Sequence, residues 1–149
     1  MRIMGLDLTP LDDAIAQLEE AIEYHGSDLT SRDPALKLHL RAAAIQAFEF
    51  TYELSFNMVK RHLEQVSPNP AELDKMSFKA IMREAFRRGL VQSEVSTWDQ
   101  YRTLRGTTSH TYNAGKAQMV FESLPDFLRE ARFLRDQLEQ RNESLDDPD

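Results

Sequence analysis

The stretch DPALKLHLRAAAIQAFEFTYELSFNMVKRHLEQ, residues 33–65, decides the fold, because it predicts one helix long enough for the other helices to pack against. Asp33 and Pro34 are typical of a helix start, since a carboxylate accepts from free backbone N–H groups and proline suits the first helical position. An ordinary surface helix carries one apolar stripe, whereas this one carries two, which predicts burial on two sides. The first stripe is Leu36, Leu40, Ala43, Ala47, Phe50, Leu54 and Met58, and the second is Ile45, Phe48, Tyr52, Phe56, Val59 and Leu63.

Shorter apolar patterns on both sides of the long helix predict its packing partners. Strong helix formers dominate the composition, while the chain has only 5 glycines and 6 prolines. The patterns cover residues 9–24, 77–88, 93–105 and 113–141. We therefore expect an all-α fold, an up-and-down bundle of four to five helices with one long central helix.

Helix-breaking residues set the expected boundaries. The run SPNP at residues 67–70 ends the long helix, and Gly89 ends the next one. Pro125 kinks or restarts the last helix. We expect residues 1–141 to form a single helical domain and residues 142–149 to form a flexible acidic tail.

Composition indicates a soluble intracellular protein. The chain has 149 residues, of which 41% are hydrophobic and 29% charged, which suits one domain with a real core. It has no cysteine, which fits a reducing cytoplasm, and no apolar run that approaches a signal peptide or a membrane span. The net charge of −7 argues against broad, non-specific nucleic-acid binding but leaves room for a small basic site.

A second stretch, RGTTSHTY at residues 105–112, concentrates the polar chemistry of the chain. Arginine offers a charged planar fork that matches a phosphate, and histidine takes and gives protons near neutral pH. Together they suffice for metal-independent RNA cleavage, in which histidine moves the proton of the attacking ribose 2′-OH and arginine stabilises charge at phosphorus. A continuous helix would set Arg105 and His110 about 140° apart. A turn, or a symmetric dimer with one copy from each chain, would bring them to one pocket.

The spacing alone leaves a structural interpretation open. Arg105 would then cap the C-terminus of one helix, and Thr111 or Asn113 would cap the N-terminus of the next. His110 would be a hinge residue between the two helices. Gly106 and its hydroxyl-bearing neighbours disfavour an unbroken helix under either interpretation.

A polar row occupies the remaining face of the long helix. It consists of Glu49, Glu53, Asn57 and Arg61. The row is either a solvated face with helical charge pairs, or it turns Glu49 or Glu53 toward the motif to orient Arg105. Arg102 and Ser109 are further candidates for supporting roles.

Arg105, His110 and Tyr112 follow the pattern Arg-x4-His-x-Tyr, which resembles the signature of HEPN-domain proteins of the nucleotidyltransferase substrate-binding-protein-like, or HepT toxin, family. The strings SHTY at residues 109–112 and FEFTYEL at residues 48–54 are similar to that family as well. The resemblance covers roughly residues 6–140 and implies a HEPN-like helical bundle.

The resemblance also implies a toxin–antitoxin pair. The chain would be a metal-independent endoribonuclease toxin, neutralised when a cognate minimal nucleotidyltransferase adds AMP to the motif tyrosine. Carried over by position, Arg105 and His110 would be the catalytic pair, and Tyr112 would accept AMP and help to position the substrate. The family usually has a polar residue, often asparagine, directly after the motif arginine, whereas this chain has Gly106.

Two other functional interpretations remain open. Family members were first described as substrate-binding subunits of a two-protein nucleotidyltransferase, in which the motif pocket would hold a nucleotide or a partner loop without catalysis. The third interpretation is a structural dimer with a hinge at the motif. We expect a homodimer through the long helix or the motif edge, because the long helix carries more apolar surface than one core needs.

No pattern in the chain predicts a metal or a cofactor. His39 and His62 are 23 positions apart without a carboxylate pattern around them, and there is no His-Glu-x-x-His string and no glycine-rich phosphate loop. The chain also lacks the Gly-Ser pair followed by spaced aspartates that nucleotidyltransferases use. It would therefore be the partner of a transferase and not the transferase.

Overall fold

The structure is a computed structural model in which residues 5–146 are described. These residues form helices and contain no β-strand, which confirms the all-α prediction. The helices are α1 (Thr9–His25), α2 (Asp28–Ser31), α3 (Pro34–Val66), η1 (Pro70–Lys75), α4 (Phe78–Arg87), α5 (Val95–Thr107), η2 (Thr108–His110) and α6 (Ala114–Asp146), where η marks a 3₁₀ helix. No helix in this range is both long enough and apolar enough to cross a membrane.

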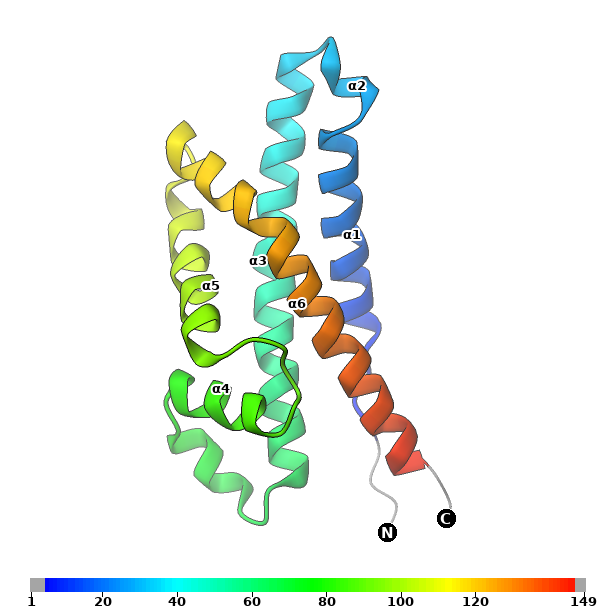
Figure 1. The fold of residues 1–149 in the computed structure, drawn as a ribbon, viewed down its shortest axis with the longest axis vertical. Coiled ribbons are helices and arrows are strands. Elements are labelled where there is room, and N and C mark those ends of the chain that lie inside the picture. The colour runs from blue at the N-terminus through cyan, green and yellow to red at the C-terminus, as the bar shows by residue number, and fades with distance from the viewer. Residues whose placement is uncertain (1–4, 147–149) are drawn as a thin grey trace.

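Helix α3 is the axis of the bundle (Figure 1). In the view of Figure 1, α1 runs up, α3 down, α5 up and α6 down, so that α6 crosses the other long helices, while α4 packs beside the lower end of α3. The Asp33 carboxylate accepts from the backbone N–H of Leu36 at 3.1 Å, which confirms the expected helix start. The arrangement is the up-and-down bundle with one long central helix that the sequence predicts.

An aromatic cluster joins α3, α5 and α6. The ring of Phe127, on α6, lies 4.9 Å from Phe48, 5.1 Å from Tyr101 and 6.2 Å from Trp98 between centroids. All three pairs are edge-to-face, which is a geometry that aromatic rings prefer. Phe127, Phe48 and Trp98 have no solvent exposure. The cluster therefore fixes α5, which carries the motif arginine, against the other two helices.

The two apolar stripes of α3 have different surroundings. The second stripe faces the core, with Phe48 and Val59 wholly buried. The first stripe is covered only in part, because Ala47 and Met58 are buried whereas Phe50 is 48% exposed and Ala43 is exposed. The expected burial on a second side is therefore not completed within the described part of one chain.

Two local features differ from the sequence prediction. The segment after α1 contains the one-turn helix α2, which the sequence analysis missed. The Thr30 hydroxyl closes this segment by donating to the carbonyls of His25 at 2.7 Å and Ser27 at 2.9 Å. Pro125 lies inside α6, which is a single helix, so the helix is not restarted there.

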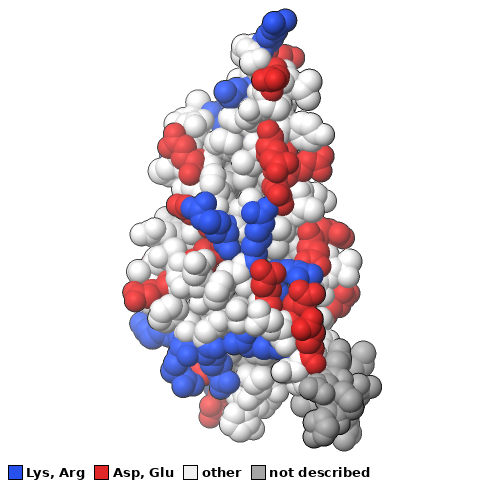
Figure 2. Space-filling model, turned by 45° about the vertical axis from the view of Figure 1, so that its right-hand side comes forward, with Lys and Arg blue, Asp and Glu red and all other residues white. Residues whose placement is uncertain are grey.

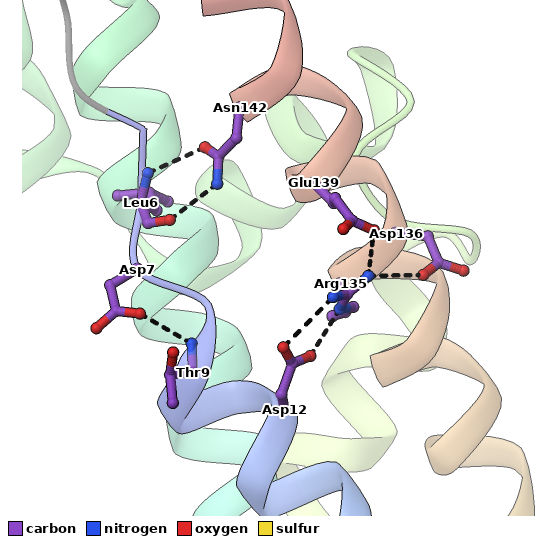
Figure 3. Close-up of polar contacts among 8 residues, drawn as sticks. All are labelled: Leu6, Asp7, Thr9, Asp12, Arg135, Asp136, Glu139 and Asn142. Atoms are coloured by element: carbon purple, nitrogen blue, oxygen red, sulfur yellow. Dashed lines mark hydrogen bonds and ion pairs between the residues drawn. The ribbon is translucent and has the colours of Figure 1, made fainter. Parts of the chain in front are cut away.

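Helix α6 also extends to Asp146 instead of ending near Arg141, and side-chain contacts to the N-terminal segment explain the extension (Figure 3). The Asn142 amide accepts from the Leu6 backbone N–H at 3.0 Å and donates to the Leu6 carbonyl at 2.8 Å. These bonds give the last turns of α6 a tertiary partner that local sequence does not reveal. The rest of the predicted tail, residues 147–149, lies outside the described residues.

About two helical turns before Asn142, an ionic contact also joins α6 to α1 (Figure 3). Arg135 donates through Nε to the Asp12 carboxylate at 2.6 Å and forms a second ion pair with Glu139. These carboxylates hold the pKa of Arg135 above its usual value. The side chains are partly exposed, so we expect this pair to contribute orientation more than stability.

Candidate functional site

The motif occupies the turn that joins α5 to α6, at the upper left of Figure 1. Arg105 lies in the last turn of α5, which runs two residues further than the sequence suggested, through Gly106 to Thr107. The hydroxyls that follow then satisfy the free carbonyls of the helix end. Thr108 donates to the Arg105 carbonyl at 2.6 Å, and Ser109 donates to the Gly106 carbonyl at 2.9 Å. This bonding explains why a run rich in hydroxyl residues forms an ordered turn.

The Arg105 guanidinium is held between α3 and the motif turn. Its Nη2 donates to Glu53 at 2.5 Å, its Nη1 donates to the Thr108 hydroxyl at 3.1 Å, and Glu49 lies 3.9 Å from Nη1. Its Nε is buried without a hydrogen-bond partner. The structure therefore brings both predicted carboxylates to the arginine. Thr108 was missed by the sequence analysis, although a hydroxyl three residues after an arginine at a helix end is a recognisable signal.

His110 and Tyr112 point toward solvent on the same turn. Their rings form an edge-to-face pair with centroids 6.1 Å apart. Tyr112 is 87% exposed, which is the highest exposure among the large apolar and aromatic side chains of the described range. Asn113 begins α6 by accepting from the backbone N–H of Lys116 at 3.0 Å, as the structural interpretation expects of a cap. The helix start thus needs Asn113 but leaves His110 and Tyr112 free for other roles.

The remaining candidates have other partners. The Arg102 guanidinium lies 4.8 Å from the ring centroid of Phe78 and so links α5 to α4. A Cβ built at Gly106 meets no atom within 4 Å, so packing does not require glycine there. Within residues 5–146, no group of three or more His, Asp or Glu side chains is placed to hold a metal ion.

Comparison with known proteins places the chain in a family. The family model described as "Nucleotidyltransferase substrate binding protein like" matches residues 6–140. The chain belongs to this family. A curated relative from Haemophilus influenzae, named "Probable ribonuclease HepT", is 42% identical over 140 residues, which is 93% of this chain and 95% of the relative.

Two solved structures share the fold of this nucleotidyltransferase substrate-binding-protein-like chain. A Haemophilus influenzae protein, described as showing the fold of a substrate binding domain of a nucleotidyltransferase, is 40% identical with a TM-score of 0.84, covering 89% of this chain and 99% of its own. A Thermus thermophilus protein is 27% identical with a TM-score of 0.61, covering 89% of this chain and 98% of its own. The predicted family and fold are therefore confirmed.

Proposed function

We propose that this protein is a HEPN-type toxin, a metal-independent endoribonuclease that a cognate minimal nucleotidyltransferase neutralises. The observation that carries the proposal is the motif turn, where Arg105 is held by Glu53 and Thr108 while His110 and Tyr112 face solvent. The 42% identity to a protein named a probable ribonuclease supports the same conclusion.

In the proposed reaction, His110 and Arg105 divide the chemistry. His110 takes the proton of the ribose 2′-OH as the 2′-oxygen attacks phosphorus. The protonated His110 then gives a proton to the departing 5′-oxygen. The new bond joins the 2′-oxygen to phosphorus, and the bond to the 5′-oxygen breaks. Arg105 binds the phosphate and stabilises the charge that builds up at phosphorus. RNA cleavage by the purified protein in the presence of a chelator tests this function directly.

We also propose that the protein acts as a homodimer. The unburied part of the first α3 stripe, which includes Ala43 and the 48% exposed Phe50, offers an apolar surface for a second copy. A two-fold axis near the motif turn would place two copies of Arg105 and His110 around one RNA strand. Such a site would combine the arginine of one chain with the histidine of the other.

Removing the Glu53 carboxylate is expected to lower the rate of cleavage. Glu53→Ala leaves the Arg105 guanidinium without its shortest contact, and misplacement of a phosphate-binding group lowers the rate by about tenfold or more. The loss should fall on kcat more than on KM. Glu53→Gln keeps an acceptor oxygen in place and should restore most of the rate, as single-turnover cleavage assays can measure.

The matched control for this experiment is Asn57→Ala. Asn57 is exposed one turn further along the same face of α3. The Asn57→Ala substitution should leave the rate of RNA cleavage unchanged. If Glu53→Ala cleaves RNA as fast as the unchanged protein, Glu53 does not position Arg105.

Tyr112→Phe is expected to abolish AMP addition by the partner. Tyr112 is 87% exposed, so its hydroxyl is open to a second protein, and phenylalanine removes only that hydroxyl. The measurement is the mass of the protein after incubation with ATP, Mg²⁺ and a candidate partner, a minimal nucleotidyltransferase. Tyr24→Phe is the control, because Tyr24 is also exposed, at 45%. AMP found on the Tyr112→Phe protein would remove Tyr112 from the proposed role.

The alternative function is a non-catalytic, nucleotide-binding subunit of a two-component nucleotidyltransferase. A groove of about 340 Å³ between α5 and α6 favours it, because the groove includes Thr107, directly before η2, and Met119 of α6. A nucleotide bound there would lie beside the motif without being cleaved. Nucleotide or partner binding without RNA turnover by the unchanged protein would support this function over the nuclease.

A further inference from the structure

A cavity of about 370 Å³ lies at the end of the bundle away from the motif turn. In Figure 1 this is the lower end, where the last turn of α3, the segment after α4 and the last turns of α6 meet. The residues that line it are His62, Val66, Arg88, Arg141, Ser144 and Leu145. None of them belongs to the motif or contacts it, so the proposed nuclease chemistry does not account for this cavity.

The two arginines of the cavity carry more positive charge than their surroundings neutralise. Arg141 donates to the Gln137 side chain and to the Arg88 carbonyl, both at 2.7 Å, and has no carboxylate partner among the described residues. Arg88 shares the single carboxylate of Glu84 with Arg87. Burial and the nearby charge of Arg88 lower the pKa of Arg141. Basic side chains also gather near this end in Figure 2. The cavity therefore attracts anions.

His62 is the buried polar group of the cavity. Its side chain is 6% exposed and forms part of the cavity wall. Burial, together with the charges of Arg141 and Arg88, lowers its pKa to about 4, so the imidazole is neutral at pH 7. The imidazole lines the cavity and presents a polar edge among otherwise basic and apolar side chains. A neutral imidazole carries one N–H, which can donate to a ligand that accepts a hydrogen bond.

We propose that this cavity binds a small phosphate monoester that carries an apolar or planar body. Arg88 and Arg141 would hold the phosphate, and the His62 N–H would donate to it. Val66 and Leu145 would contact the body, since ligand sites combine apolar walls with a few placed polar groups. The volume is also within the usual range of about 300–1,000 Å³ for such sites. The cavity is separate from the nuclease motif, so this proposal does not depend on the proposed nuclease activity.

Titration with AMP, adenosine and inorganic phosphate tests the proposal. Calorimetry should show AMP binding, and the NMR resonances of the His62 imidazole should shift with it. Adenosine should bind at least about tenfold more weakly, because it lacks the charge-assisted contacts. Inorganic phosphate should also bind more weakly than AMP, because it has no apolar or planar group to contact Val66 and Leu145. Equal binding of adenosine, equal binding of phosphate, or no shift at His62 would each overturn the proposal.

A pair of adjacent arginines gives a matched set of variants. Arg88→Gln removes a cavity guanidinium and should weaken AMP binding by about tenfold or more. Arg87→Gln makes the same charge change beside the same Glu84 but outside the cavity lining, and should leave binding unchanged. Equal weakening by both variants would indicate only long-range attraction and would contradict a specific site.

A second variant tests the site without touching a charge. Ser144 is exposed at the cavity edge, and Ser144→Tyr should block the cavity and abolish AMP binding while the protein stays folded. Unchanged AMP binding by this variant would place the ligand elsewhere. A short RNA without a terminal phosphate should fail to displace AMP. Displacement of AMP by that RNA would mean that the cavity binds the phosphodiester backbone of RNA, and would overturn the proposal that it binds a phosphate monoester.

Discussion

Replacing His110 with alanine is expected to abolish metal-independent RNA cleavage without unfolding the protein. General acid–base catalysis by one side chain contributes about 10²–10⁴-fold to a rate, and Arg105 cannot replace it because arginine stays protonated. His110 is exposed, and its ring contact is with Tyr112, so its removal leaves no cavity. The measurement compares cleavage of RNA by the two proteins in chelator, together with their thermal unfolding.

The control for this variant is His39→Ala. His39 is exposed on α3 and lies outside the motif, so its loss should leave cleavage unchanged. Cleavage by the unchanged protein and by His39→Ala, but not by His110→Ala, would establish His110 as part of the site. No cleavage by any of the three, with all folded, would contradict the nuclease and favour the binding subunit. A large drop in stability of His110→Ala would instead indicate a structural hinge.

Phe127→Ala is expected to have the largest effect on stability, a loss of about 3–5 kcal/mol in the free energy of unfolding. Phe127 is wholly buried and contacts the rings of Phe48, Trp98 and Tyr101, so alanine leaves a cavity where three helices meet. The free energy of unfolding of a native domain is only about 5–15 kcal/mol, so the variant should be close to unfolding. Urea unfolding followed by circular dichroism measures the change.

Phe86→Ala is the matched control for the core. Phe86 is 41% exposed on α4, so the same substitution removes less buried surface there and should cost far less stability. A loss below about 1 kcal/mol for Phe127→Ala would mean that the aromatic cluster does not hold α5 against α3 and α6. The position of Arg105 would then need another explanation.

Much of the fold follows from local sequence. The Asp33 cap, which accepts from the Leu36 N–H at 3.1 Å, lies where the sequence predicts it, and the Ser77 hydroxyl caps α4 in the same local way by accepting from the Ala80 N–H at 3.1 Å. Gly89 follows α4 with a φ of +72°, a left-handed conformation that favours glycine. These features depend on residues three or four positions apart, and such contacts can be derived from spacing alone. The resemblance carried by the motif pointed to the same family that the comparisons show.

Helix α2 and the contact of Thr108 with Arg105 are local features that the sequence analysis missed, whereas other missed features depend on contacts between distant parts of the chain. Local patterns end the last helix near Arg141, whereas α6 runs to Asp146, and Asn142 in this extension bonds to Leu6, 136 positions away. Likewise, the cavity at the end of the bundle away from the motif brings His62 and Arg141 together, and no local pattern relates two such positions. Sequence spacing cannot show which distant groups will meet.

The sequence by itself determined the helices, their approximate ends, the family and the motif that carries the three candidate site residues. Only the tertiary structure decided which face of α3 meets the motif. It brings Glu53 to within 2.5 Å of Arg105 across 52 positions of sequence and leaves Tyr112 87% exposed. The reason is physical: helix formation depends on neighbouring residues, whereas the partner of a side chain depends on how whole helices pack, which the burial of Phe48, Trp98 and Phe127 decides together.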